Sequence, residues 1–177
     1  MQRIVLTFGL IGGAVITVMM ALTLPFQDQI GFDRGAIVGY TTMVLAFLMV
    51  YFGVRSYRDL VAGGVITFGR AVQVGLLISL VITVCYVVTW QVMYYAFMPD
   101  FLAKYTAFAL EKARQGGASE ADLARQATEL RDFATMYRNP LVNIAFSFLE
   151  PLPVGLVFTL VTAGVLGRRG GQPGGGA

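Results

Sequence analysis

Four long stretches of the sequence carry almost no charge, and no other feature constrains the fold as strongly. They cover residues 4–26, 35–54, 71–97 and 141–167. About 20 apolar residues in a helix span about 30 Å, which is the thickness of the hydrocarbon core of a bilayer. The sequence therefore predicts an all-α membrane protein with four transmembrane helices.

The composition supports this prediction. Of the 177 residues, 56% are hydrophobic and 13% are charged, whereas charged residues make up about 25% of a soluble domain. A soluble protein this poor in charge would expose large apolar patches. We therefore expect one membrane domain over residues 1–169, followed by a disordered glycine-rich tail over 170–177. The net charge of +3 is small and spread along the chain, which argues against nucleic acid as a partner.

Residues 101–137, between the third and fourth stretches, are rich in charge and predict a helical hairpin outside the membrane. Gly116 and Gly117 are expected to end its first helix. Ser119, followed three residues later by Asp122, is typical of the start of a second helix. Each helix has one apolar face at helical spacing. We expect these faces to pack together, with contact to the membrane surface as the alternative.

Glu150 is the one acidic residue inside a predicted span, about ten residues into the fourth stretch. A charge at that depth costs about 3 kcal/mol on insertion scales. Its side chain is therefore expected to face the bundle interior, to pair, or to stay protonated. Pro151 and Pro153 follow it, and proline lacks the N–H that a helix needs. They predict a kink with free carbonyls, as in the broken helices of transporters.

Two interpretations of Glu150 follow from its position. In the functional one, Glu150 forms a proton or cation site, or a polar anchor for a ligand, together with Gln91 of the third stretch. In the structural one, it makes a hydrogen bond to Gln91, to a tyrosine such as Tyr40, or to a backbone N–H.

Arg55, Arg58 and Arg70 flank the short turn between the second and third stretches. Arginine binds phosphate through two hydrogen bonds, so this cluster could hold a lipid headgroup together with Tyr57 and Thr67. Alternatively, the three side chains only orient the protein by reaching the membrane surface. Thr67 is also expected to cap the third helix.

A stripe of small residues follows one face of the first predicted helix at four-residue spacing. It consists of Gly9, Gly13, Thr17 and Ala21. Small side chains allow two helix backbones to approach closely in a membrane. The stripe predicts close helix packing, either within one chain or between two copies of it.

The sequence offers no catalytic constellation. It contains no histidine, and its single cysteine, Cys85, lies within the third apolar stretch. No serine therefore has a histidine to activate it, and the carboxylates lack the spacing of known metal motifs. We expect a protein that is not an enzyme, without catalytic residues, a metal site or a cofactor.

Six segments of the sequence resemble a family of bacterial membrane proteins known as domain of unknown function 4199. They are RSYRD at 55–59, GGVITFGRA at 63–71, FMPDF at 97–101, GASE at 117–120, MYRNP at 136–140, and FLE at 148–150 followed by PVG at 153–155. The likeness runs from about residue 3 to residue 169. It implies a bacterial membrane location and carries no activity.

Three functional hypotheses remain. The first is a scaffold or accessory subunit of a membrane assembly, whose partner would be a second copy or another membrane protein. The second is a small proton- or ion-coupled carrier centred on Glu150, and the third is a lipid-binding protein that uses the arginine cluster. We expect a multi-pass protein of the bacterial inner membrane. Three arginines in the short turn over residues 55–70 favour cytoplasmic termini.

Overall fold

The computed structural model describes residues 1–168, and the predicted tail over 170–177 lies outside the described residues. The chain is helical almost throughout. Its elements in order are α1 (Gln2–Thr23), the 3-10 helix η1 (Leu24–Phe26), α2 (Gln27–Ile30), α3 (Phe32–Leu60), β1 (Ile66–Thr67), α4 (Phe68–Phe97), α5 (Phe101–Gln115), α6 (Glu120–Tyr137), α7 (Pro140–Leu149), α8 (Leu152–Leu166) and β2 (Gly167–Arg168).

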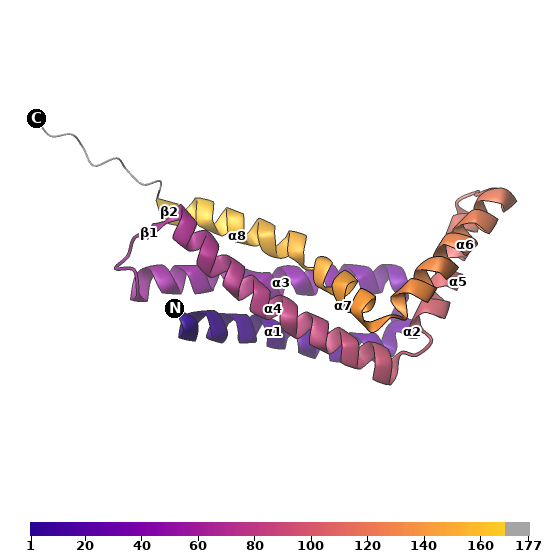
Figure 1. The fold of residues 1–177 in the computed structure, drawn as a ribbon, viewed down its shortest axis with the longest axis horizontal. Coiled ribbons are helices and arrows are strands. Elements are labelled where there is room, and N and C mark those ends of the chain that lie inside the picture. The colour runs from indigo at the N-terminus through magenta and orange to yellow at the C-terminus, as the bar shows by residue number, and fades with distance from the viewer. Residues whose placement is uncertain (169–177) are drawn as a thin grey trace, which may run out of the picture.

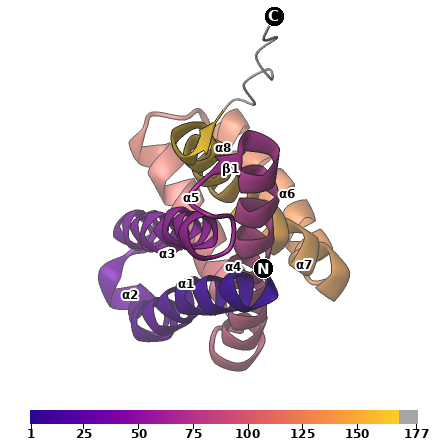
Figure 2. The same ribbon diagram turned by 90° about the vertical axis from the view of Figure 1, so that its left-hand side faces the viewer.

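Four long helical segments form an elongated bundle, and the α5–α6 hairpin projects from one end of it (Figure 1). The segments Gln2–Ile30, Phe32–Leu60, Phe68–Phe97 and Pro140–Leu166 are each long and apolar enough to cross a membrane. Helix α4 packs against α1, α3 and α8, as the view turned by 90° also shows (Figure 2). The predicted all-α fold with four spans and a hairpin between the last two is confirmed.

The outward faces of the bundle are apolar. Leu22, Ile37 and Val165 are each more than 60% exposed, and many other large apolar side chains point outward from the same helices. A surface of this kind would aggregate in water, whereas lipid tails solvate it. The chain is a multi-pass membrane protein.

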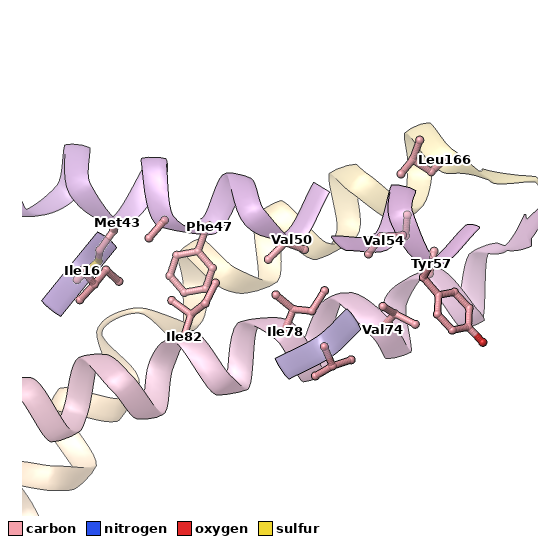
Figure 3. Close-up of a cluster of buried hydrophobic side chains, with 14 of the residues drawn as sticks. Ile16, Met43, Phe47, Val50, Val54, Tyr57, Val74, Ile78, Ile82 and Leu166 are labelled. Carbon is pink, nitrogen blue, oxygen red and sulfur yellow. The ribbon is translucent and has the colours of Figure 1, made fainter. Parts of the chain in front are cut away.

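The core of the bundle lies where α3 and α4 face each other. Phe47 and Val50 of α3 are fully buried, as are Ile78 and Ile82 of α4, and Figure 3 shows these side chains between the two helices. Helix α8 comes close enough that a Cβ on its Gly155 would lie 2.8 Å from the ring of Phe47. The glycine therefore allows α8 to pack directly on the core.

Local signals in the sequence explain where several helices begin and end. The hydroxyl of Thr67 accepts a hydrogen bond from the backbone N–H of Arg70 at 3.4 Å, and that of Ser119 accepts one from Asp122 at 3.2 Å. Both residues cap their helices as predicted. Gly117 has a φ of 84°, a conformation that glycine adopts without strain, and it turns the chain between α5 and α6.

Several observed helices begin two or three residues before the predicted spans, and two differences are larger. Helix α3 continues to Leu60, beyond the predicted limit at residue 54, so its last turn carries the charged residues outside the apolar stretch. The fourth span, predicted over 141–167, consists of two helices, α7 and α8, with a break between Leu149 and Leu152. The two prolines predicted this interruption.

At the end of the bundle opposite the hairpin, two short strands pair through their backbones. Ile66 and Thr67 of β1 pair in parallel with Gly167 and Arg168 of β2. The pairing connects the turn before α4 to the end of α8. It lies on the same side as the start of α1 (Figure 1).

Candidate functional site around Glu150

Glu150 lies at the break between α7 and α8. Ten residues of α7 precede it, which places it about 15 Å along the fourth span. Pro151 is buried at the start of α8. The prolines predicted free carbonyls in the preceding turn, Phe146 among them, but the carbonyl of Phe146 still accepts a hydrogen bond from the N–H of Glu150 at 3.2 Å. The correction follows from the position of the ring, since a proline removes only the bond that its own N–H would donate.

The partner of Glu150 is Tyr86 of α4. The Tyr86 hydroxyl donates a hydrogen bond of 2.5 Å to Oε2 of Glu150, and the Tyr86 side chain is only 7% exposed. A tyrosine was among the expected partners, with Tyr40 as the example. Tyr86 was missed because aromatic residues near the end of a span usually mark the lipid–water interface. Its place within the apolar stretch, eleven residues before Phe97, was the available signal.

Gln91, which we grouped with Glu150, instead contacts a second polar group. Its amide Nε2 donates a hydrogen bond of 2.7 Å to Oδ1 of Asn143, and Oγ of Ser147 lies 3.2 Å from the same oxygen. Asn143 is fully buried, and its Nδ2 has no hydrogen-bond partner within residues 1–168. The structure thus separates the predicted polar site into two hydrogen-bonded groups, Glu150 with Tyr86 and Gln91 with Asn143.

Glu150 and Tyr86 line a cavity of about 660 Å³. It extends from the middle of the bundle, at Ile16 and Met43, to the hairpin, at Phe108. This volume lies in the range of pockets that bind small molecules. Most of the lining is apolar or aromatic, and the aromatic residues come from α3, α4, α5 and α6: Phe32, Tyr40, Tyr86, Trp90, Phe101, Tyr105, Phe108, Phe133 and Tyr137.

The cavity contains one basic residue, which is already paired, and Glu150, which has no basic partner among the described residues. Among its lining residues, Lys112 is the only base, and its Nζ lies 2.5 Å from a carboxylate oxygen of Asp33. Within the described chain, no cationic group lies within ion-pair distance of Glu150. The Glu150 side chain is exposed. A carboxyl group without a cation of its own therefore borders an open, aromatic cavity of the membrane domain.

The hairpin forms one wall of the cavity. Phe32, at the start of α3, packs against the rings of Phe101, Tyr105 and Phe108 of α5, with centroid distances of 5.8, 5.7 and 5.1 Å. The apolar face of α5 therefore contacts the bundle and lines the cavity, in addition to facing α6. Our expectation considered only the partner helix and the membrane surface, because a sequence does not show which third element lies nearby.

Helix α6 also reaches the cavity, through Tyr137. The indole N–H of Trp90 donates a hydrogen bond of 3.0 Å to the Tyr137 hydroxyl. Burial raises the pKa of the Tyr137 phenol above its ordinary value, so this hydroxyl stays neutral. The bond fixes the end of the hairpin against α4, next to the side chains that line the cavity.

The sequence over residues 7–168 matches the model of a family described as a protein of unknown function, DUF4199. The chain belongs to this family. The match covers nearly all the described residues and confirms the resemblance seen in the sequence. No curated protein and no solved structure matches the chain. The function of this DUF4199 protein is therefore argued from its own site.

The arginine cluster of this DUF4199 protein lies at the opposite end of the bundle from the hairpin. Arg58 and Arg55 both approach Asp59, at 2.7 and 3.8 Å. Arg70 donates a hydrogen bond of 3.1 Å to the Tyr57 hydroxyl. Because Asp59 already neutralises part of the cluster, the positive charge left for a lipid phosphate is smaller than the sequence suggests.

The small-residue stripe of the same protein packs inside the monomer. A Cβ on Gly9 would lie 2.6 Å from Cβ of Val81, and one on Gly13 would lie 2.7 Å from Cβ of Cys85. Thr17 forms a hydrogen bond of 2.8 Å with Thr89 of α4, while Ala21 is exposed. Of the two predicted uses of the stripe, the structure shows packing within one chain.

Metal ligands do not gather in this DUF4199 protein. Over residues 1–168, no group of three or more histidine, cysteine or acidic side chains is close enough to hold an ion. The cavity around Glu150 is therefore the feature of the described chain that is best suited to bind something.

Proposed function

We propose that this protein binds a small, largely apolar molecule in the cavity around Glu150 and acts as a carrier or receptor for it. The observation that carries this proposal is a cavity of about 660 Å³ with Glu150 on its wall. Known ligand sites combine a mostly apolar lining with a few polar groups that orient the ligand. Here the polar groups are Glu150 and the Tyr86 hydroxyl bound to it.

The geometry supports the scaffold hypothesis less than it supports ligand binding. That hypothesis relied on the stripe on α1 as a docking face, and Gly9 and Gly13 of the stripe pack against α4. It relied also on a free apolar face of the hairpin, and part of that face lines the cavity. The site also favours a carrier that is not an enzyme. The two carboxyl groups in the cavity, those of Asp33 and Glu150, are bound to Lys112 and Tyr86, and the chain has no histidine.

The location of the protein is part of the proposal. We place it in the bacterial inner membrane, with the termini and the arginine-rich turn in the cytoplasm and the hairpin on the opposite side. In this orientation the hairpin end of the cavity faces away from the cytoplasm.

Trp90 supplies a direct test, because it is the only tryptophan in the chain and lines the cavity. The uncharged fluorophore N-phenyl-1-naphthylamine absorbs tryptophan emission, so its binding quenches Trp90 by energy transfer. We expect saturable quenching by this probe with the purified protein in nanodiscs. Empty nanodiscs, together with the Trp90→Phe variant, measure the background from partition into lipid.

Two glycine variants make this test specific. Gly39 lines the cavity and Gly164 lies on the exposed face of α8, and a Cβ at either position meets nothing within 4 Å. Gly39→Leu should weaken probe binding by about fivefold, or about 1 kcal/mol, because the new side chain occupies the cavity. Gly164→Leu should leave binding unchanged. Equal affinities for both variants would show that the probe binds elsewhere and would overturn the proposed function.

A further inference from the structure

We propose that the ligand of this cavity is a hydrophobic monocation, such as an amine or quaternary ammonium group on an aromatic or aliphatic frame. The inference rests on the proposed function and makes it more specific, by naming the charge of the molecule that binds. It is carried by the pairing of Glu150 with an aromatic cavity that holds no free base.

Charge balance in the cavity favours a cation. A carboxylate in a membrane interior is costly without a counter-charge. The hydroxyl of Tyr86 supplies one hydrogen bond to Glu150 but no charge. Lys112, the only base that lines the cavity, is paired with Asp33 and belongs to the hairpin. A ligand cation beside Glu150 would provide the missing charge, whereas a ligand anion would be repelled.

The aromatic walls of the cavity also favour a cation. Tyr40, Tyr86, Trp90 and Tyr137 line the same cavity as Glu150. The faces of aromatic rings attract cations, most strongly when the site is shielded from water, and proteins recognise quaternary ammonium groups in this way. Aromatic walls combined with a carboxylate that has no basic partner among the described residues therefore fit an organic cation better than a neutral molecule of the same size.

A small inorganic cation does not fit this cavity as its main ligand. Hard metal ions require about six oxygen ligands to replace their water. Glu150 and the tyrosine hydroxyls come from separate helices, and most other side chains in the lining are apolar. A cavity of about 660 Å³ is also far larger than one ion requires. A bulky apolar frame would fill this volume while its charged centre lies beside Glu150.

Tetraphenylphosphonium and tetraphenylborate provide a matched pair of probes, since they have almost the same shape and opposite charge. We would measure the binding of radiolabelled tetraphenylphosphonium to the purified full-length chain and compete it with unlabelled tetraphenylphosphonium or with tetraphenylborate. The expected result is saturable binding that the cation displaces at least about tenfold more effectively than the anion. Equal displacement by the two ions would overturn the inference.

Two variants test the role of the carboxylate. Glu150→Gln keeps the shape of the side chain and removes its charge, and we expect it to weaken tetraphenylphosphonium binding by about tenfold or more. Glu129→Gln removes the same charge from the exposed face of α6 and should change nothing. Unaltered cation binding in Glu150→Gln would overturn the inference. If that variant does not fold, the preference of the unaltered protein for the cation over the anion still decides.

The two proposals fail in different ways. If N-phenyl-1-naphthylamine binds in the cavity and tetraphenylphosphonium does not, the proposed function stands and the cation inference is wrong. A neutral ligand bound to a protonated Glu150 would then be the explanation. If Gly39→Leu weakens neither the quenching of Trp90 by N-phenyl-1-naphthylamine nor the binding of radiolabelled tetraphenylphosphonium, both proposals are wrong.

Discussion

At the scale of single residues, the pairing of Tyr86 with Glu150 links two helices that are far apart in sequence. A hydrogen bond to a carboxyl group contributes about 1–3 kcal/mol, and the lower end applies here because the Glu150 side chain is exposed. We expect Tyr86→Phe to lower the thermal unfolding midpoint, measured by circular dichroism in detergent, through a loss of about 1 kcal/mol. The infrared carboxyl band of Glu150 should shift in the same variant.

Tyr95 provides the control for this prediction. It lies on the same helix and is 50% exposed, and the structure shows no side-chain hydrogen bond for it within the described residues. Tyr95→Phe should therefore leave both the midpoint and the infrared band unchanged. If the two variants behave alike, the contact between Tyr86 and Glu150 contributes nothing to stability.

A second prediction at this scale concerns the close approach of α1 and α4 at Gly13. A Cβ at this position would lie 2.5 Å from Sγ and 2.7 Å from Cβ of Cys85, which requires the helices to separate. We expect Gly13→Ala to destabilise the monomer by about 1–3 kcal/mol, as overpacking generally does. Gly39→Ala, where a Cβ meets nothing within 4 Å, should be neutral in the same thermal unfolding measurement.

This experiment also distinguishes the two uses of the stripe. If the glycines formed a contact between two copies, Gly13→Ala would change the oligomeric state and leave the unfolding of the monomer unaltered. Light scattering on the purified protein measures the first quantity, and circular dichroism measures the second. The structure predicts a change in unfolding alone.

At the scale of elements, aromatic packing holds the hairpin to the bundle, and Phe32 contributes the contacts to α5 from the start of α3. Its ring packs against three aromatic residues of α5. The ion pairs of Lys104 with Asp28 and Lys112 with Asp33 involve side chains that are at least half exposed, and each contributes at most about 1 kcal/mol. Aromatic packing that removes apolar area from water contributes more.

We therefore expect Phe32→Ala to loosen the hairpin more than the double variant Lys104→Gln/Lys112→Gln. Amide hydrogen exchange over α5, followed by mass spectrometry, measures the effect directly. The control is Phe52→Ala, since Phe52 is 44% exposed on the outer face of α3 and should leave exchange in α5 unaltered. Faster exchange in the lysine variant than in Phe32→Ala would show that the ion pairs hold the hairpin.

At the scale of the whole molecule, four spans place the hairpin and the arginine-rich turn on opposite sides of the membrane. Ser119 lies in the hairpin turn, and Val65 lies between α3 and α4 with 51% of its surface exposed. In a Cys85→Ala background, Ser119→Cys should react with a membrane-impermeant maleimide on intact cells. Val65→Cys should react only after the cells are permeabilised.

The outcome of this labelling tests topology and orientation separately. Reaction of both cysteines on intact cells would contradict the arrangement of four spans. Reaction of Val65→Cys alone would keep the four spans and reverse the proposed orientation. The arginines at positions 55, 58 and 70 favour reaction of Ser119→Cys alone on intact cells, because basic residues in short turns remain in the cytoplasm.

The sequence by itself determined the elements of this protein. Four apolar stretches can satisfy their backbone groups in lipid only as helices, so the spans are readable from local composition. The hairpin was equally readable, because Ser119 and the two glycines before it define helix ends within a few residues. Pro151 and Pro153 likewise predicted the break between α7 and α8, since the missing N–H of a proline is a property of the residue itself.

Only the tertiary structure decided which residues meet. Tyr86 and Glu150 are 64 positions apart, and the depth of Tyr86 within its own span does not show which residue of another span it meets. The cavity is less predictable still, because its wall combines α1, α3, α4 and both hairpin helices. A cavity is the space that side chains leave unfilled, and that space depends on how the helices tilt and pack. Local sequence fixes each helix, whereas long-range packing decides what the helices enclose.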